Sequence, residues 1–457
     1  MRNNEQSSGD LTPEQRTAAE SLAAFIDSAP SPWHAGEQVI ARLESAGFIR
    51  LSERQPWALQ TNTGYFVVRD QSSLIAFHTG SGGVDQQGYR VVAAHTDSPG
   101  FRIKPCPLDV RPAGTRLGVE IYGGPIIPTF ADRDLCLAGR LFITRDDGSL
   151  GICLMRTTQA MLRLPTPAIH LNRGVNADGL KFDLQNETGL VLLTLADELP
   201  EQQAFIPLLA EWAGVNAECI RGWELAVVDA QPAALFGPGE AALAAGRIDN
   251  LASCHAALTS LLDTNSDRAG QGADAVRMIA LFDHEEVGSQ SFKGAESPFL
   301  ADTLVRISAN FGADASGHRQ ALSRSFVISA DMAHAEHPSY ARFHDQTHPV
   351  RLNGGPVIKI NVNQRYASDG GGEVLFETLC REVDVPAQRY VHRNNLPCGS
   401  TIGPITAARL GVRCVDVGNA MWSMHSIRET TGSRDQARMI AVLKRFFTRE
   451  TLPLVAD

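Results

Sequence analysis

The spacing of apolar positions predicts two helices at the start of the chain. Residues 12–15 (TPEQ) have the pattern of a helix N-terminus, with a threonine cap, proline at the first helical position and a glutamine that can cap in return. Apolar residues continue at helical spacing as far as Ile26. A second helix is predicted to begin after Ser31 and to end at Gly47.

Compact apolar runs predict the strands of a buried sheet. They are GYFVVR (64–69), SLIAFH (73–78), YRVVAAH (89–95), VRMIALF (276–282), FVISAD (326–331), PVIKINV (356–362) and VRCVDVG (412–418). Runs of this kind are typical of strands that helices cover on both faces. One such helix is predicted from an apolar stripe formed by Leu251, Cys254, Leu258, Leu261 and Leu262.

The pattern changes near Pro105. From there to about residue 235, short alternating segments such as 117–123 and 136–144 are separated by proline-rich turns, which is typical of a β-rich unit. After the turn at 237–239, strands and helices alternate again. The sequence therefore predicts an α/β fold, in which a mixed central sheet flanked by helices carries an inserted β-rich domain. The predicted boundaries are 1–104 and 236–457 for the two parts of the catalytic domain, and 105–235 for the inserted β-rich domain.

Composition narrows the possible partners. The chain has 457 residues with 41 Lys and Arg against 51 Asp and Glu, for a formal net charge of -10. It shows no basic run, so we expect no nucleic-acid partner. No apolar run approaches the roughly 20 residues that span a bilayer, so we expect no membrane partner. The polar start MRNNEQSSGDLTPEQ and eight cysteines without a CxxC pair predict a cytoplasmic location.

Residues that can bind metals cluster after the predicted strands. They are His95 and Asp97, Asp249, Glu285 and Glu286, Asp331, and His425. The carboxyl ends of strands in an open α/β sheet face one crevice, so these distant residues can meet there. Two histidines with three carboxylates are too many ligands for one cation but suit two, and the mixed N/O set favours zinc or a similar first-row ion. Asp249, at a turn before a rigid helix, is the candidate bridge between two ions.

The adjacent glutamates pose a separate question. At the bent end of a strand, Glu285 and Glu286 can address one cleft from different angles. One can then ligate a metal while the other accepts a proton from water, a role for which desolvation would raise its pKa. Spacing alone does not say which glutamate has which role.

Several motifs resemble those of the aspartyl aminopeptidase family. They are HTDSPGFRIKP, YGGPIIPTFADRDLCLAGRL, GRIDNLAS, FDHEEVGSQSFKGAES, DMAHAEHPSY, GPVIKINVNQRYA and PCGSTIGPITAARLGVRCVDVGNAMWSMHSIRE. The resemblance runs from about residue 18 to 448. It implies a zinc-peptidase-like catalytic domain with two zinc ions, an aminopeptidase activity, and a β-rich lid and oligomerisation domain at 105–235. The implied assembly is a hollow tetrahedral homo-dodecamer.

The resemblance also implies a role for each metal-site residue. His95 and Asp331 would hold one metal ion, Glu286 and His425 the other, and Asp249 would bridge the two. Glu285 would then be the general base, and Asp97 would orient the imidazole of His95. Two zinc ions are implied, with manganese or cobalt as the alternative in one site.

Four further residues resemble the family's substrate-binding positions. His334, Lys359 and Tyr366 match positions around the pocket for an acidic N-terminal side chain, and His170 resembles a histidine offered to a neighbouring subunit. A cationic group such as Lys359 is the physical requirement for binding the side chain of Asp or Glu. The expected substrates are short peptides with an acidic N-terminus.

Alternative interpretations remain open at the level of sequence. Asp249 precedes a helix and could cap it, and Lys359 could be a solvated edge residue. The same fold could serve a dipeptidase, carboxypeptidase or deacylase. A protein of another class, a non-catalytic shell or peptide-binding protein, is a further alternative, although a complete ligand set with a base argues against it.

Overall fold

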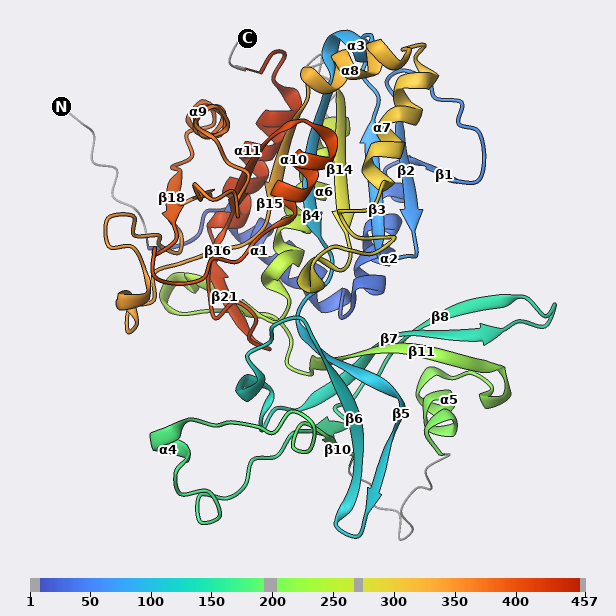
Figure 1. Cartoon of the computed structure of the whole chain (residues 1–457), viewed down its shortest axis with the longest axis vertical. Helices are drawn as coiled ribbons and strands as arrows, with labels where there is room; N and C mark the ends of the chain where they lie inside the picture. The colour runs from blue at the N-terminus through green and yellow to red at the C-terminus, as the bar shows by residue number, and fades with distance from the viewer. Residues whose placement is uncertain (1–8, 193–203, 267–273, 453–457) are drawn as a thin grey trace.

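The computed structural model describes residues 9–192, 204–266 and 274–452. Figure 1 shows two lobes: a large one in which helices surround a sheet, and a smaller one built of long strands. Among the described residues, no helix is both long and apolar enough to cross a membrane.

The two N-terminal helices form where the sequence predicts them. Helix α1 spans Pro13–Ser28 and helix α2 spans Pro32–Ser45. The side chain of Thr12 accepts a hydrogen bond from the backbone N–H of Gln15, and the Gln15 side chain accepts one from the N–H of Thr12, both at 3.2 Å. This reciprocal cap satisfies backbone donors that the first helical turn leaves free.

The large lobe is organised around a nine-stranded mixed sheet within the described part of the chain. In sheet order its strands are β1 (Ile49–Leu51), β2 (Gly64–Arg69), β3 (Ser73–His78), β14 (Val276–Phe282), β4 (Tyr89–His95), β15 (Phe326–Ala330), β19 (Arg413–Gly418), β17 (Val357–Ile360) and β18 (Gln388–Val391). The central strands β14, β4, β15 and β19 run parallel to one another. Their carboxyl ends therefore meet at one edge of the sheet.

Helices cover both faces of this sheet. On one face lie α1, α2, α6 (Ile248–Ser266), α9 (Gly370–Glu382) and α11 (Asp435–Thr448). On the other lie α7 (Phe299–Asn310), α8 (Ala315–Ser323) and α10 (Ile402–Leu410). Successive strand residues point to opposite faces of the sheet. Val92 packs against the helices of the first face, and Val91 packs against α7, α8 and α10 on the other. Burial on both faces explains why these strands are continuous apolar runs in the sequence.

The smaller lobe is a seven-stranded sheet within the described residues. Its strands are β11 (Ile220–Asp229), β5 (Gly100–Arg111), β6 (Gly114–Tyr122), β10 (Leu190–Leu192), β9 (Leu162–Arg163), β7 (Leu135–Thr144) and β8 (Leu150–Arg156). An additional pairing of β11 with β7 gives the sheet a barrel-like closure around its own hydrophobic core. The short helices α4 (Val175–Asp178) and α5 (Phe205–Ala213) belong to this lobe (Figure 1).

The mixed α/β fold of the sequence prediction is confirmed, and the barrel-like sheet is compatible with an inserted domain. Its first strand begins at Gly100, slightly before the predicted boundary at residue 105. A third sheet, of five strands in the described residues, joins β12 (Ala234–Phe236), β13 (Ala242–Ala245), β21 (Glu429–Gly432), β20 (Ala420–Trp422) and β16 (Ala333–His334). The exact division at residues 104 and 235 stays a prediction.

Candidate metal centre

The edge where the parallel strands end carries the candidate site. His95 is the last residue of β4, and Asp331 follows β15 directly. The 3-10 helix η4 (Glu285–Val287) begins shortly after β14 and contains both adjacent glutamates. Asp249 lies at the start of α6, and His425 lies in the loop between β20 and β21.

The structure brings these side chains together in overlapping groups. His95, Asp249 and Asp331 form one group, and Asp249, Glu286 and His425 form another, each with ligand atoms within 4.8 Å of one another. A third group joins His95 with Glu285 and Glu286 under the same limit. All six residues predicted to bind metal or act as the base therefore face one small volume.

Asp249 lies between the two histidines. Its Oδ1 is 3.4 Å from Nε2 of His95, and its Oδ2 is 3.6 Å from Nε2 of His425. The carboxylate is buried, and Oδ1 has no hydrogen-bond partner among the described residues. A buried carboxylate oxygen without a partner is costly, and a cation would satisfy it. The side chain of Asp249 points into the cluster and its Oδ1 accepts no backbone N–H of the described residues, so the helix-cap alternative does not describe this oxygen.

Backbone carbonyls orient both imidazoles. Nδ1 of His95 lies 3.1 Å from the carbonyl oxygen of Asp97, and Nδ1 of His425 lies 3.0 Å from that of Gly124. A carbonyl oxygen only accepts hydrogen bonds, so each Nδ1 must carry the proton and donate it. Each Nε2 is then free to act as a metal ligand on the side that faces the carboxylates.

Asp97 binds other groups besides the imidazole of His95, which it is expected to orient. Its Oδ1 lies 3.4 Å from Nδ1 of His95. The same carboxylate accepts the backbone N–H of Glu285 and that of Glu286, each at 3.1 Å, and the hydroxyl of Tyr122 at 2.7 Å. One buried group therefore fixes both a histidine and the turn that carries the two glutamates.

The electrostatics of the cluster favour bound cations. Burial raises the pKa of Glu285 to about 8. It also raises the pKa of Glu286 and of Asp249, because the charge of the nearby histidines lowers these pKa values by less than burial raises them. Burial also favours the neutral imidazole of His95, yet its carboxylate neighbours raise that pKa well above the ordinary value. Buried carboxylates with two imidazoles are the ligands that zinc accepts, so the residues present suit a zinc centre.

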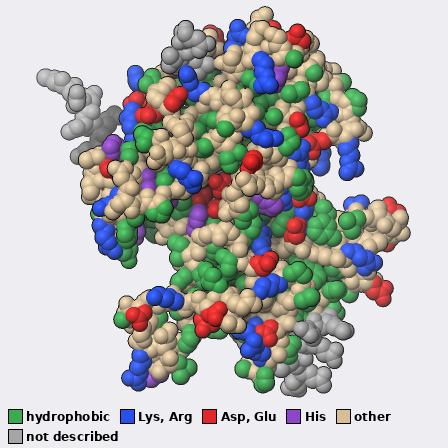
Figure 2. All heavy atoms as spheres, in the orientation of Figure 1, with side chains coloured by type: hydrophobic (Ala, Val, Ile, Leu, Met, Phe, Trp, Pro, Cys, Tyr) green, Lys and Arg blue, Asp and Glu red, His purple; other side chains and the backbone are tan. Residues whose placement is uncertain are grey.

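A cavity of about 340 Å³ opens over the cluster. Besides the metal-site residues it is lined by Gly288, Ser289, Met332, His334, Lys359, Tyr366, Gly399, Ser400, Thr401, Ile405 and Met424. In Figure 2, acidic and histidine side chains gather in the hollowed middle of the molecule, between the two lobes. The volume is in the range of small-ligand sites.

The cavity wall contains three of the predicted substrate-binding residues. The Nζ of Lys359 donates to Oδ2 of Asp331 at 3.2 Å and to the carbonyl of Met332 at 3.0 Å, and it lies 5.2 Å from the centre of the Tyr366 ring. Lys359 is 2% exposed, which excludes the alternative of a solvated edge residue. Burial and then the charge of Lys359 lower the pKa of His334 to about 4, so this imidazole is neutral near neutral pH.

His170 lies elsewhere. It occupies an exposed turn of the smaller lobe and does not line the cavity. Its predicted role, in the active site of a neighbouring subunit, stays a prediction.

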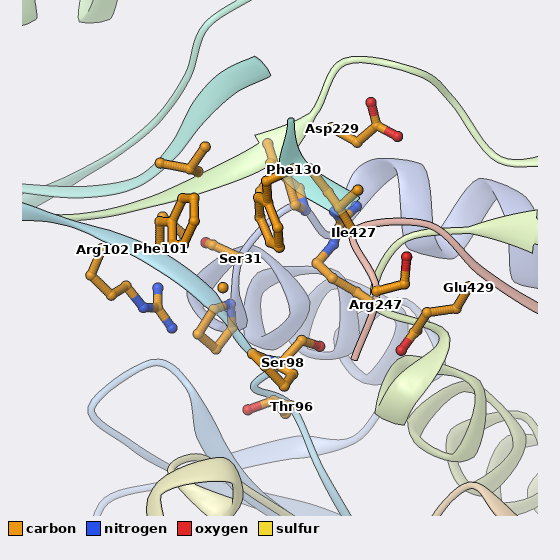
Figure 3. Close-up of a pocket in the computed structure, with 18 residues that line it drawn as sticks. Ser31, Thr96, Ser98, Phe101, Arg102, Phe130, Asp229, Arg247, Ile427 and Glu429 are labelled. Carbon is orange, nitrogen blue, oxygen red and sulfur yellow. The ribbon is translucent and has the colours of Figure 1, made fainter. Parts of the chain in front are cut away.

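One buried residue of the site was missed by reading the sequence. Glu429 begins β21 and is 1% exposed; its Oε1 accepts the backbone N–H of His425 at 2.8 Å, and its Oε2 accepts that of Asp249 at 3.0 Å. It borders a small cavity of about 40 Å³ at the junction of the two lobes, where Figure 3 shows it near Arg247. The motif ending in MHSIRE contains Glu429, but sequence gives no sign that a carboxylate will bind backbone donors from two distant segments.

The chain is similar to known aminopeptidases along nearly its whole length. A family model described as Aminopeptidase I zinc metalloprotease (M18) matches residues 25–447. A Pseudomonas aeruginosa protein named "Probable M18 family aminopeptidase 2" is 42% identical over 437 residues, covering 94% of this chain and 98% of that protein.

Solved structures agree with this similarity. The cryo-EM structure of the Ape4 and Nbr1 complex contains a chain that superposes with a TM-score of 0.92 at 36% identity, covering 96% of this chain and 87% of that one. The S. cerevisiae mApe1 dodecamer superposes with a TM-score of 0.82 at 25% identity, covering 94% of this chain and 96% of that one.

Proposed function

The chain belongs to the M18 family of zinc aminopeptidases, and on that premise we propose that it removes an N-terminal Asp or Glu from short peptides with two metal ions and a glutamate base. The observation that carries the proposal is Asp249, whose two oxygens face the Nε2 atoms of two different histidines. A carboxylate in that position suits a pair of cations better than a single one.

The proposed ligand sets follow the two groups of side chains. His95 and Asp331 would hold one ion, Glu286 and His425 the other, and Asp249 both; zinc is the expected metal, with manganese or cobalt as alternatives in one site. When bound, the ions would supply Lewis acidity, which polarises a peptide carbonyl and lowers the pKa of water.

Glu285 is the proposed general base. Burial raises its pKa to about 8. A pKa near the working pH lets the same carboxyl group first accept a proton and then donate it. It would take a proton from the attacking water and deliver it to the nitrogen of the leaving amine. The neighbouring Glu286, whose Oε2 lies 3.5 Å from Nε2 of His425, is better placed to share a cation with that histidine.

The acidic preference would come from Lys359. Its ammonium group is buried in the cavity wall, where an ion pair with a substrate carboxylate is less screened by water than at the surface. The neutral imidazole of His334 would contribute hydrogen bonding, and Tyr366 would shape the pocket. The carboxylates of the cluster would attract the positively charged α-amino group, which restricts cleavage to the N-terminus.

We extend the proposal to assembly and location. A solved relative is a dodecamer, which supports a homo-oligomer here, with a tetrahedral dodecamer as the expected form. His170, on an exposed turn of the smaller lobe, would then reach the active site of an adjacent subunit. The cytoplasm is the proposed location.

The role of Glu285 can be tested with Glu285→Gln. The variant keeps the shape of the side chain but cannot accept the proton, so kcat should fall by a factor on the order of 10³ while zinc content stays at the wild-type value. Steady-state kinetics and elemental analysis measure the two quantities. Glu296→Gln, a change at an exposed glutamate nearby, is the matched control and should leave both unchanged. Retained turnover in Glu285→Gln would exclude this residue as the base.

A panel of substrates distinguishes an aminopeptidase from the alternative activities. Dipeptides and tripeptides that begin with Asp, Glu or Leu should be cleaved with the acidic ones preferred, and N-acetylated versions should be inert. Cleavage of blocked peptides, or release from the C-terminus, would instead indicate a deacylase or carboxypeptidase of the same fold. Absence of any hydrolysis with added zinc, manganese or cobalt would support the non-catalytic alternative.

A further inference from the structure

A buried ion pair closes the loop that carries the two glutamates. Asp283 follows β14 and Lys293 ends the loop; Nζ of Lys293 lies 2.9 Å from Oδ2 of Asp283. The two residues are 1% and 2% exposed, respectively. At this distance Lys293 supplies the nearest opposite charge to the buried Asp283 carboxylate.

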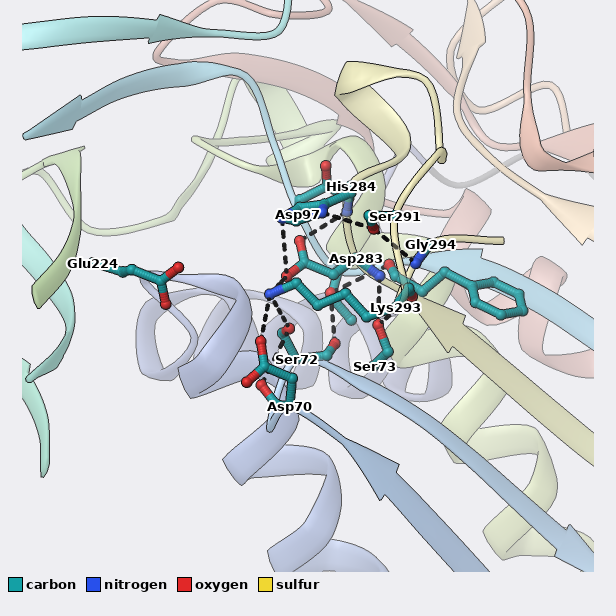
Figure 4. A network of polar contacts seen from close by, with 12 residues as sticks. Asp70, Ser72, Ser73, Asp97, Glu224, Asp283, His284, Ser291, Lys293 and Gly294 are labelled. Carbon is teal, nitrogen blue, oxygen red and sulfur yellow. Dashed lines mark hydrogen bonds and ion pairs between the residues drawn. The ribbon is translucent and has the colours of Figure 1, made fainter. Parts of the chain in front are cut away.

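The start of β3 anchors both ends of the same loop. The backbone N–H of Asp283 donates to Oγ of Ser73 at 2.8 Å, and that hydroxyl donates to the carbonyl of Lys293 at 2.8 Å. Nζ of Lys293 also donates to Oγ of Ser72 at 3.1 Å. Within the loop, Nδ1 of His284 lies 2.9 Å from Oγ of Ser291, so this histidine is turned toward the loop itself (Figure 4).

A second carboxylate connects this loop to the smaller lobe. Asp70, in the turn before β3, places Oδ2 within 2.9 Å of Nζ of Lys293. Its two oxygens also accept both terminal nitrogens of Arg140, at 2.8 and 2.9 Å, and Arg140 belongs to β7 of the seven-stranded sheet. The Nε of Arg140 in turn donates to Oε2 of Glu224 in β11 at 2.6 Å.

The ring of Trp33 closes this network on another side. The guanidinium of Arg140 lies 5.0 Å from its centre and the ammonium of Lys293 lies 5.8 Å from it. Attraction between the cations and the ring helps to hold both in place. The network thus runs without a gap from β11 and β7, through Asp70, to the two ends of the glutamate loop.

We propose that Lys293 and Asp283 are positioning residues for Glu285, and that Arg140 and Asp70 make the smaller lobe part of the same support. Neither Lys293 nor Asp283 lines the cavity, so they act on the reaction only through the loop. The ion pair fixes the separation of the loop ends, and Asp97 fixes the turn between them, so the Glu285 carboxylate is left few alternative positions. This inference rests on the proposed role of Glu285 as the base.

The first experiment compares variants of the ion pair. Lys293→Met leaves Asp283 buried without its partner and can prevent folding, so the charge-neutral double variant Asp283→Asn/Lys293→Met is made beside it. In the double variant kcat should fall by at least about tenfold, with KM and zinc content within about twofold of wild type. Lys293→Arg, which keeps the charge, should recover part of kcat. Unchanged kcat in a folded double variant would overturn the proposal.

The second experiment tests the connection to the smaller lobe without relying on catalysis. In Arg140→Met, amide hydrogen exchange of the segment 283–293 should become faster, because Asp70, which also binds Lys293, loses the guanidinium that holds both of its oxygens. Arg116→Met is the matched control, since Arg116 pairs with Asp109 inside the same sheet and contacts no residue of this loop. Equal exchange of segment 283–293 in wild type, Arg140→Met and Arg116→Met would overturn the connection.

The two experiments separate failure of this inference from failure of the proposed function. If wild-type protein hydrolyses no peptide, the function is wrong, and the hydrogen-exchange result still decides the connection between lobe and loop. If wild type is active and the double variant retains its kcat, the function stands and the positioning role is wrong.

Discussion

Lys359 is the side chain on which substrate choice is expected to depend. Its ammonium group is buried and already touches Asp331, a proposed metal ligand. A metal ion bound to Asp331 would weaken that contact and leave the lysine charge available to the carboxylate of a substrate. The same residue therefore connects the proposed metal ligands to the proposed specificity pocket.

We predict that Lys359→Met removes most of the preference for acidic N-termini. A charge-assisted hydrogen bond contributes about 1.5–3 kcal/mol, so the ratio of kcat/KM for Asp over Leu substrates should fall by roughly tenfold to a hundredfold. Competition kinetics with paired peptides measures the ratio. Lys359→Arg is the matched control that keeps the charge. A ratio that is unchanged in Lys359→Met would remove Lys359 from the specificity pocket.

The sequence predicts the side chains that converge in the cluster better than the side chains that support them. His95 and Asp331 are recognisable because one ends an apolar strand and the other directly follows one, where α/β folds place ligands. Glu429 and Lys293 are not, since their partners are backbone groups or side chains brought near only by the fold. The assignment of Glu285 and Glu286 to different roles likewise rested on family resemblance, because two adjacent residues have no spacing to distinguish them.

Among the helices, α6 connects the metal cluster to the core. It begins beside Asp249 and packs between α1 and α11. At this junction His255 is fully buried; its Nε2 lies 2.9 Å from Oγ of Ser21 and its Nδ1 lies 2.9 Å from the side-chain nitrogen of Gln436. The three helices thus share a polar contact at this junction.

We predict that His255 makes the packing of α6 sensitive to acid. Burial lowers its pKa from the ordinary 6.5 to about 3, so between these values the unfolded chain binds the proton and the folded one does not. Stability is therefore full above pH 6.5 and is lost as pH falls toward 3, by about 2 kcal/mol from this residue at pH about 5. Urea unfolding at a series of pH values measures the slope.

The variant His255→Gln tests this origin of the acid sensitivity. Glutamine can keep hydrogen bonds to both neighbours but does not titrate, so the loss of stability between neutral pH and pH about 5 should shrink by about 2 kcal/mol. His348→Gln, a change at a surface histidine on a loop, is the control. Identical pH slopes for wild type and His255→Gln would show that His255 is not the source.

Elements with their own hydrophobic pattern were predictable, and those that depend on a partner strand were not. The capping pattern at Thr12 and the apolar runs of β4, β14, β15 and β19 each carry a local signal, and all formed as expected. Strands such as β9 (Leu162–Arg163) and β16 (Ala333–His334) have two residues each and exist through pairing with distant neighbours. No local pattern encodes such pairing.

In the molecule as a whole, the candidate metal centre lies where the two lobes meet. His95, Asp331 and Asp249 belong to the large lobe, whereas the imidazole of His425 is oriented by the carbonyl of Gly124, which follows β6 of the smaller one. The network through Asp70 and Arg140 connects the lobes at a second place. Both sets of contacts hold the seven-stranded sheet against the carboxyl edge of the large sheet.

We predict that removing the metal lowers the stability of the folded chain at this contact between the two lobes. Chelation would leave the carboxylates of Asp249, Glu285 and Glu286 together in a buried site, so the apparent melting temperature should fall by several degrees. Each ion present at about a thousand times its Kd stabilises the folded state by about 4 kcal/mol. Returning zinc stepwise should restore the melting temperature and saturate at about two ions per chain, because Asp249 is placed to serve both groups.

Asp249→Asn is the informative variant: it keeps the side-chain shape but removes the shared charge, and should bind at most one ion tightly. Saturation of the wild-type chain at one equivalent, with Asp249→Asn unaffected, would contradict a bridged pair, and it would leave His425 and Glu286 without a metal to hold.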